Sequence, residues 1–171
     1  MSDVMRNIEV EKVTFNVGAG KDQALLEKGM LLLESLTGIT PIKTVTQKRI
    51  PSWGIRPGLP VGTKITIRDQ TKIKDLLVRC LKAKEDSLKS TCFDNNGNIA
   101  FGIHECIDVP GLEYDPNIGI IGFQVCITLK RPGFSINKKV VGRKKIGKKH
   151  LISNEDSIEF MKKEYGLEVL E

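Results

Sequence analysis

The stretch IEVEKVTFNV (Ile8–Val17) alternates apolar and polar side chains along its length. A period of two is typical of a β-strand that buries one face. The alternation slips by one position near Lys12, which predicts a β-bulge. Gly18–Gly20 interrupts the pattern, and leucines then recur at helical spacing until Thr37 and Gly38 end the helix. A half-buried strand followed directly by an amphipathic helix predicts an α/β protein.

The rest of the chain adds strands and helices to this beginning. Val61–Arg68 and Phe123–Leu129 alternate in the same way, and Ile39–Arg49 is rich in β-forming residues. Residues 71–84 place apolar side chains at i, i+3, i+4, i+7 and i+8, which is typical of a helix with one buried face. A capping-box variant at Ser153 opens a short C-terminal helix. We therefore expect a sheet covered on one side by two helices.

The length and the cysteines set limits on the class of protein. A chain of 171 residues can form one domain with its own core. Its four cysteines lie at least 12 positions apart, without the close spacing of a zinc or redox site, so buried reduced thiols are expected. The N-terminus has no apolar segment of a signal peptide. We expect one soluble, intracellular domain over residues 1–171, with no metal and no cofactor.

Charge is distributed unevenly along the sequence, although the net charge is only +6. Residues 35–68 contain six basic residues and no acid, and residues 116–154 contain nine basic residues and no acid. The remainder of the chain holds all 21 acidic residues. Two basic surfaces on an acidic body are typical of polyanion binding, and long acid-free windows favour nucleic acid over an ordinary solvated face.

Polar residues of the first acid-free window lie on two of the expected strands. They offer cations for phosphates and short hydrogen-bonding groups for sugar hydroxyls and base edges. The set comprises Lys43, Thr44, Thr46, Gln47, Lys48, Arg49, Lys64, Thr66 and Arg68. Because the aromatic signature of single-strand RNA-recognition modules is absent, a flat polar face of this kind favours structured RNA read by its shape.

A rigid loop, RIPSWGIRPGLPVG (residues 49–62), connects these two strands and is called the finger below. Its three prolines restrict the unbound loop, which lowers the cost of ordering it on a partner. The flanking strands offer no acid or nucleophile for a catalytic lid to cover. We expect Arg56 to meet phosphate and Trp53 or Ile55 to pack on a nucleotide; the alternative is that Trp53 folds back onto the sheet.

The second acid-free window ends in an aperiodic basic segment, residues 132–150. We expect this segment to be mobile in the free protein and to become ordered on RNA phosphates. Its seven cations are Lys138, Lys139, Arg143, Lys144, Lys145, Lys148 and Lys149.

Two short motifs could indicate functions other than RNA binding, namely nucleotide binding and catalysis. NVGAGKD (residues 16–22) lies between strand and helix but fails both nucleotide-binding fingerprints, leaving a tight turn whose amides could contact an RNA backbone. FGIHECIDV (residues 101–109) places His104 and Cys106 on one face of an extended segment, but a catalytic dyad also needs a converging third group. We therefore expect no enzyme; a small enzyme using His104 and Cys106 is the alternative of a different class.

Five motifs in order make the chain resemble the family of the universal large-subunit ribosomal protein number five. They are IEVEKVTFNVGAG, LTGITPIKT, GIRPGLPVGTKITIR, FDNNGNIAFGIHE and GLEYDPN, and they cover nearly the whole chain. The tail from residue 131 is similar to the archaeal and eukaryotic branch, and the short C-terminus favours an archaeon.

The resemblance implies a fold, a site and partners. The fold is α/β (α+β), a two-layer sandwich of a curved antiparallel sheet with helices on one face. Family positions that face 5S rRNA match Asn16, Thr44 and Thr66, with Lys43, Lys48 and Lys64 as basic neighbours.

The implied role is to attach 5S rRNA to the large subunit's central protuberance, as a monomer within a cytoplasmic ribosome and with no membrane partner. Other implied partners are large-subunit rRNA, neighbouring large-subunit proteins, P-site tRNA and a protein of the small subunit's head. The finger would supply the tRNA and small-subunit contacts, through Ser52, Trp53, Gly54, Ile55, Arg56, Pro57 and Gly58. A free-standing RNA-binding regulator or chaperone remains the alternative from the same chemistry.

Overall fold

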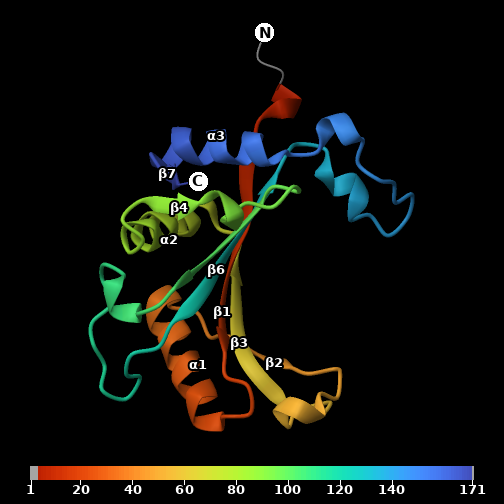
Figure 1. The fold of residues 1–171 in the computed structure, drawn as a ribbon. Helices are drawn as coiled ribbons and strands as arrows, with labels where there is room; N and C mark the ends of the chain where they lie inside the picture. The colour runs from red at the N-terminus through yellow and green to blue at the C-terminus, as the bar shows by residue number, and fades with distance from the viewer. Residues whose placement is uncertain (1–3, 171) are drawn as a thin grey trace.

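A five-stranded antiparallel sheet forms the centre of the protein in the computed structural model, which describes residues 4–170 (Figure 1). The strand order is β2-β3-β1-β6-β5, so β1 is the middle strand. The bounds are β1 Glu9–Gly18, β2 Ile42–Val45, β3 Pro60–Ile67, β5 Asn98–Ile103 and β6 Phe123–Lys130. Two further short strands, β4 Ser87–Lys89 and β7 Glu168–Leu170, pair in parallel beside the main sheet.

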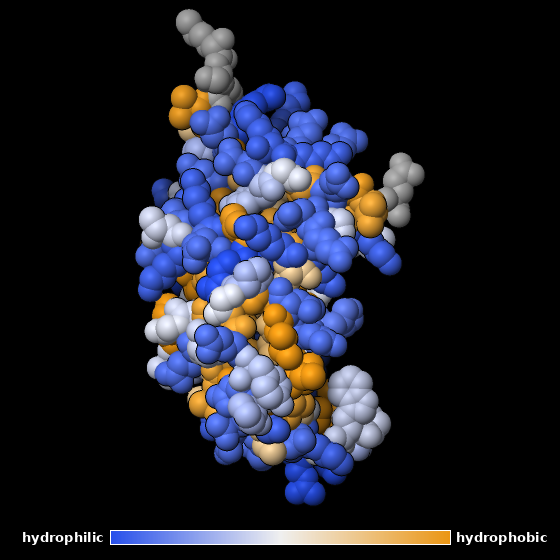
Figure 2. Space-filling model, turned by 90° about the vertical axis from the view of Figure 1, so that its left-hand side faces the viewer, coloured by the Kyte–Doolittle hydropathy of each residue, from blue (hydrophilic) through white to orange (hydrophobic). Residues whose placement is uncertain are grey.

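Three α-helices lie on one side of the sheet and leave its other side free of helices (Figure 1). They are α1 Gln23–Thr37, α2 Gln70–Lys82 and α3 Asn154–Tyr165. Figure 2 views the helix-bearing side, where hydrophilic residues dominate the upper half and hydrophobic residues reach the surface in the lower half. Short 3-10 helices occur at Val4–Arg6, Pro51–Trp53, Ser90–Cys92, Cys106–Asp108, Phe134–Asn137 and Lys148–His150. The expected two-layer sandwich is confirmed.

The opening stretch of the sequence forms the middle strand as predicted. Val13, Phe15 and Val17 are buried, and the residues between them are half-buried on the other face. The register with β6 shifts between Val10 and Lys12, which confirms the predicted bulge.

The helix ends also follow the sequence signals. The Asp22 side chain accepts hydrogen bonds from two amides of the first turn of α1, and Gly38 ends the helix with φ 67°. At α3, Ser153 and Asp156 form both bonds of a capping box. The Gly38 and Ser153 caps confirm the predicted end of α1 and start of α3, whereas the Asp22 cap was not predicted.

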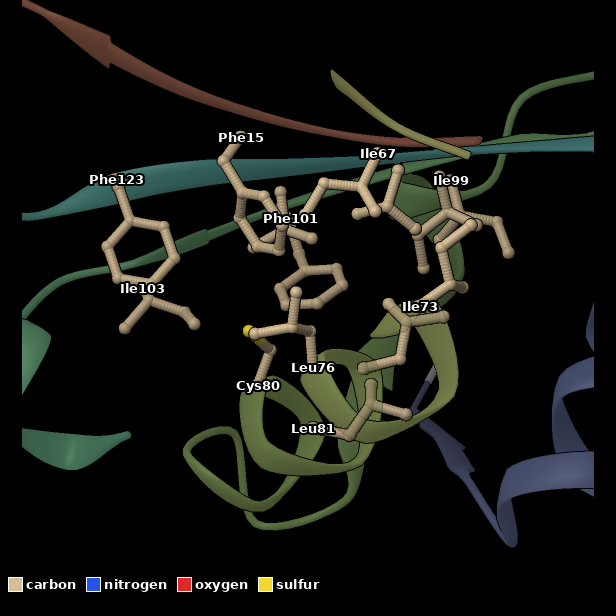
Figure 3. Packing of buried hydrophobic residues seen from close by; sticks show 14 of the residues in the cluster. Phe15, Ile67, Ile73, Leu76, Cys80, Leu81, Ile99, Phe101, Ile103 and Phe123 are labelled. Atoms are coloured by element: carbon tan, nitrogen blue, oxygen red, sulfur yellow. The ribbon is translucent and has the colours of Figure 1, made fainter. Parts of the chain in front are cut away.

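The core lies between the sheet and the three helices, and Figure 3 shows its part next to α2. Phe15 and Phe123 meet with ring centroids 6.1 Å apart, and β5 adds Ile99, Phe101 and Ile103 from its inner face. Across from them, α2 contributes apolar side chains that include Cys80. Burial raises the pKa of the Cys80 thiol to about 12, so this cysteine is an unreactive core residue. Cys106 is buried as predicted, whereas Cys92 and Cys126 are only half-buried, which corrects the expectation of buried thiols at these two positions.

Two details differ from the sequence-based expectation. The strand expected over Ile39–Arg49 is only β2, Ile42–Val45, because its register with β3 shifts after Thr44 and Pro60 then lies opposite Val45. A proline has no N–H to continue the ladder. The short strands β4 and β7 and the edge strand β5 were not predicted, since runs of three to six residues carry too little periodicity.

None of the helices within residues 4–170 is long and apolar enough to cross a membrane.

Candidate nucleic-acid interface

The helix-free side of the sheet, called the open face below, carries a grid of short polar side chains. Partners in an antiparallel register point to the same face, so the register identifies its members. From β2 to β6 they are Ile42, Thr44, Lys64, Thr66, Lys12, Thr14, Asn16, Gln124, Cys126 and Thr128.

Asn16 occupies the middle of this grid. It lies opposite Lys64 on β3 and opposite Gln124 on β6, and its Nδ2 donates a hydrogen bond to Gln124 Oε1 at 3.2 Å. This bond orients the Asn16 amide and leaves its carbonyl oxygen to accept from a ligand. An exposed cation beside an oriented amide suits a phosphate with its neighbouring sugar hydroxyl.

A second pair of polar groups lies next to Asn16. Thr14 Oγ1 and Thr66 Oγ1 are 3.2 Å apart, and either hydroxyl can be the donor. One of the two hydroxyls therefore donates its proton to the other threonine, and the second hydroxyl proton remains to be donated to a ligand oxygen.

Acidic residues are confined to one end of the main sheet. Its five strands contain only Glu9 and Glu11 as acids, both before the bulge of β1. Glu9 pairs with Lys130 at 3.3 Å, and Glu11 pairs with Lys138. From Lys12 onward the open face is therefore free of negative charge, which favours a polyanionic ligand.

The structure corrects the placement of several predicted RNA-facing residues. Lys43 is paired with Thr63, which is fully buried beneath α1, so Lys43 lies at the edge of the helix-bearing side rather than on the open face. Thr46 lies beyond β2 and holds the base of the finger, its amide and hydroxyl both donating to Leu59 O at 3.0 and 3.2 Å. Arg68 follows the last residue of β3.

Gln47, Lys48 and Arg49 also lie outside the strand. All three are exposed at the start of the finger. Of the nine strand residues predicted to face RNA, Thr44, Lys64 and Thr66 share the open face with Asn16. The other six lie around the edge of this face.

The finger is more ordered than a flexible loop. Ile50 and Ile55 exchange two backbone hydrogen bonds of 3.0 and 3.1 Å around the turn at Pro51–Gly54. Ile55 is buried, which corrects its predicted role of packing on a nucleotide, whereas Trp53 is 66% exposed and does not fold back onto the sheet. Trp53 and Arg56 are the large aromatic and the basic side chain exposed near the tip of the finger.

The basic segment is tied down at both ends. The Arg131 guanidinium donates to Leu151 O at 3.0 Å and pairs with Asp156 at 2.9 Å. His150 Nε2 is 2.8 Å from Pro132 O, and its ring meets Phe134 edge-on. The segment therefore forms a loop with a closed base that projects from the end of the sheet (Figure 1).

Its seven cations are all exposed. Lys138 pairs with Glu11, and Arg143 Nε donates to Asn137 Oδ1 at 3.4 Å. Six of these seven cations make no ion pair with the described residues: Lys139, Arg143, Lys144, Lys145, Lys148 and Lys149. This loop presents a second surface suited to phosphates.

Neither residues 16–22 nor residues 101–109, the two motifs that could indicate other functions, form a binding or catalytic site. In the turn after β1, the amides of Ala19 and Gly20 donate to Val61 O, that of Asp22 donates to Ala19 O, and those of Ala24 and Leu25 donate to the Asp22 side chain, so few amides of the turn remain for an RNA backbone.

The catalytic alternative fails on geometry as well. His104 is exposed beyond the end of β5, whereas Cys106 is buried with its Sγ 3.6 Å from Gly119 O, so the two do not share a face. Across residues 4–170, no three His, Cys, Asp or Glu side chains gather as metal ligands.

Sequence reasoning missed five polar members of the open face: Lys12, Thr14, Gln124, Cys126 and Thr128. Their signal was present, because they are the polar positions between the buried residues of β1 and β6. What the sequence lacked was the strand order that places β6 beside β1.

This fold and surface define a class of protein: an α+β domain whose open sheet face and basic loop are arranged for a structured polyanion. Comparison with known families makes the class specific. Residues 3–56 match the family profile "Ribosomal protein L5", and residues 60–160 match the profile for the C-terminus of the same family. The chain belongs to the ribosomal protein L5 family.

Individual relatives are similar over nearly their whole length. A protein named large ribosomal subunit protein uL5 from Nanoarchaeum equitans is 39% identical over 99% of this chain and 100% of that protein. The proteins of the same name from Sulfolobus acidocaldarius and Pyrobaculum aerophilum are 40% and 41% identical, over 99% and 96% of this chain and 94% and 92% of their own. The sequence is thus of the archaeal type, as the resemblance implied.

Proposed function

We propose that this protein binds 5S rRNA through its open face and attaches it to the central protuberance of the large ribosomal subunit. The observation that carries the proposal is the row Lys64–Asn16–Gln124 on an acid-free sheet face. Its groups suit phosphate and 2′-hydroxyl contacts on a folded RNA. Family membership supports a ribosomal target, because the relatives are named as large-subunit proteins.

The other two surfaces have separate partners in this proposal. The basic segment binds large-subunit rRNA through its unpaired lysines. The finger contacts P-site tRNA and the head of the small subunit through Trp53 and Arg56, which are both exposed. The protein acts as a structural component of a cytoplasmic ribosome and not as an enzyme.

Lys64→Ala tests the proposed face. We expect weaker 5S rRNA binding and a log–log salt slope smaller by about one, because one phosphate contact is lost. Lys163→Ala is the matched control, since Lys163 is an exposed lysine of α3 and lies outside the open face. If both variants keep the parent's slope, Lys64 does not contact phosphate and the proposed face is wrong.

Sedimentation tests the ribosomal role separately. We expect the native protein in the large-subunit fraction at physiological salt. A protein that binds 5S rRNA but stays out of that fraction would be a free-standing RNA-binding regulator or chaperone instead.

A further inference from the structure

The edge strand β5 has one main-sheet neighbour, β6, and a free side. Gly97 O accepts from Leu129 N at 3.1 Å, and Asn98 O accepts from Asp94 N at 2.8 Å. Because successive strand residues direct their backbone groups to opposite sides, the odd-numbered residues of β5 face β6 and the even-numbered ones face the free side. Ala100 and Gly102 therefore direct backbone groups outward.

These outward groups lack partners beyond one short bridge. Phe93 bridges to Ile99 and covers the start of the strand. Within residues 4–170, the Ala100 C=O and both the N–H and C=O of Gly102 have no partner on the free side. A row of unpaired strand groups is a template for an added strand.

The free edge is held in strand geometry by the core. Ile99, Phe101 and Ile103 point inward and pack against the apolar side chains of α2 (Figure 3). Since these side chains fix the register of β5, the unpaired groups are preorganised for binding, which lowers the ordering cost for a partner.

Open space lies on both sides of this edge. One hollow of about 430 Å³ lies beside β4 and β7, and its lining includes Lys84, Leu88, Lys89, Phe101, His104 and Leu170. A second of about 220 Å³ lies on the open face beside Gln124 and Cys126. A Cβ added at Gly102 would meet no atom within 4 Å. An added strand alternates its side chains between two faces, and both faces have room for them.

The charges select the kind of peptide. The larger hollow is lined by two lysines and a histidine, and none of its lining residues is acidic. Its floor is apolar, from Leu88, Phe101 and Leu170. A nucleic acid would match the cations but not the unpaired backbone row, whereas an extended peptide that directs acidic residues toward this hollow and apolar residues toward the hollow on the open face matches both.

We propose that the free edge of β5 is a docking site for an extended acidic segment of a partner protein, which joins the main sheet as a sixth strand. This site lies at the opposite edge of the sheet from β2 and the finger. It does not depend on the proposed binding of 5S rRNA.

The test uses the full chain and a labelled six-residue peptide in which valine alternates with glutamate. We expect saturable binding by fluorescence anisotropy, together with exchange protection of the Gly102 amide by NMR. Gly102→Pro removes the outward N–H and should weaken binding at least tenfold, while Gly102→Ala, which keeps the N–H, should bind within twofold of the parent.

Two further comparisons keep the proposal testable if Gly102→Pro fails to fold. The same peptide with N-methylated amides should lose binding to the unaltered protein at least tenfold. Lys89→Glu should weaken binding more than Lys163→Glu, which changes an exposed lysine away from the hollow.

Three results would overturn the proposal. The first is equal binding of the N-methylated peptide, and the second is equal binding of a valine–lysine peptide. The third is protection of the Gly102 amide by a single-stranded RNA but not by the acidic peptide, which would make this edge an RNA surface.

Discussion

At the scale of single residues, two neighbours that are distant in sequence determine the charge and the hydrogen bonding around Asn16. Lys64 lies beside it on β3 and Gln124 on β6. The sequence resemblance identified Asn16 and Lys64, but the bond that orients the Asn16 amide comes from Gln124. The polar position of Gln124 follows from alternation, whereas its contact with Asn16 depends on strand order.

Asp156 gives a pH-dependent prediction. Burial raises the pKa of its carboxyl, but hydrogen bonds from Ser153 and the charge of Arg131 outweigh burial, so the pKa is lowered overall. A carboxyl with a lowered folded pKa adds stability above its unfolded pKa of about 3.9, and this stability is lost as pH falls through the folded pKa. Asp156→Asn should therefore cost about 2 kcal/mol of unfolding free energy at pH 7.

Urea unfolding at pH 7 and at pH 3 measures this effect. The difference between Asp156→Asn and the parent should shrink at pH 3, because the parent carboxyl is then becoming protonated. Asp75→Asn is the control, since Asp75 is exposed on α2 and has no ion pair within residues 4–170. A difference for Asp156→Asn that stays constant with pH would contradict the prediction.

At the scale of elements, strand β3 must pass very close to β1 where the finger ends. A Cβ on Gly62 would lie 2.6 Å from Val17 O and 3.1 Å from Thr44 Oγ1. The first of these is a backbone atom of the central strand and cannot move aside. Gly62 thus allows β2, β3 and β1 to come together under the open face.

Gly62→Ala should cost about 1–3 kcal/mol of unfolding free energy, because the methyl group overpacks the sheet. Gly102→Ala is a matched control, since it adds the same methyl group to a strand of the same sheet but into open space. Denaturant unfolding of the two variants checks this. Equal losses would mean that backbone entropy, and not close approach, decides the effect.

The finger supports a prediction about tRNA. Trp53→Ala/Arg56→Ala removes both presented side chains but keeps Ile55 and its bridge to Ile50. We expect reduced P-site tRNA retention on assembled ribosomes with unchanged 5S rRNA affinity. Loss of 5S rRNA affinity with normal tRNA retention would reverse the assignment and make the finger part of the 5S rRNA anchor.

The basic segment supports a prediction about order. Its base is closed by Arg131 and His150, whereas most of its cations have no partner within the described residues. Amide exchange should be fast over residues 138–149 in the free protein and slow when RNA is bound. Strong protection without RNA would mean that the segment is an integral part of the fold.

At the scale of the whole molecule, the two segments matched by separate family profiles share one sheet. β1 and β2 come from residues 3–56, and β3, β5 and β6 come from residues 60–160. Because β1 lies between β3 and β6, residues 3–56 supply the strand that joins β3 to the β6–β5 pair. One buried hydrophobic cluster joins side chains from both.

This interleaving predicts that residues 1–171 unfold as one cooperative unit. Thermal unfolding should give the same transition whether it is followed by far-ultraviolet circular dichroism or by near-ultraviolet signals that do not come from Trp53. The isolated segment 1–56 should remain unfolded, because β1 would lack both of its neighbours. Two separate transitions would contradict the single-domain prediction.

Much of this architecture follows from the sequence alone. Alternation identified β1 with its bulge, β3 and β6, and capping residues identified the C-terminal end of α1 and the start of α3. These features rest on interactions between residues a few positions apart, so a single sequence is enough to read them. The acid-free windows likewise indicated a surface for RNA before any strand was placed.

The tertiary structure alone decided which residues meet. It placed Lys43 on the helix-bearing side, buried Ile55 inside the finger, separated His104 from Cys106 and joined Gln124 to Asn16. Each outcome depends on the register and order of strands up to 108 positions apart in sequence. Local propensity has no information about such pairing, because a shift of one residue in register moves every side chain of a strand to the other face.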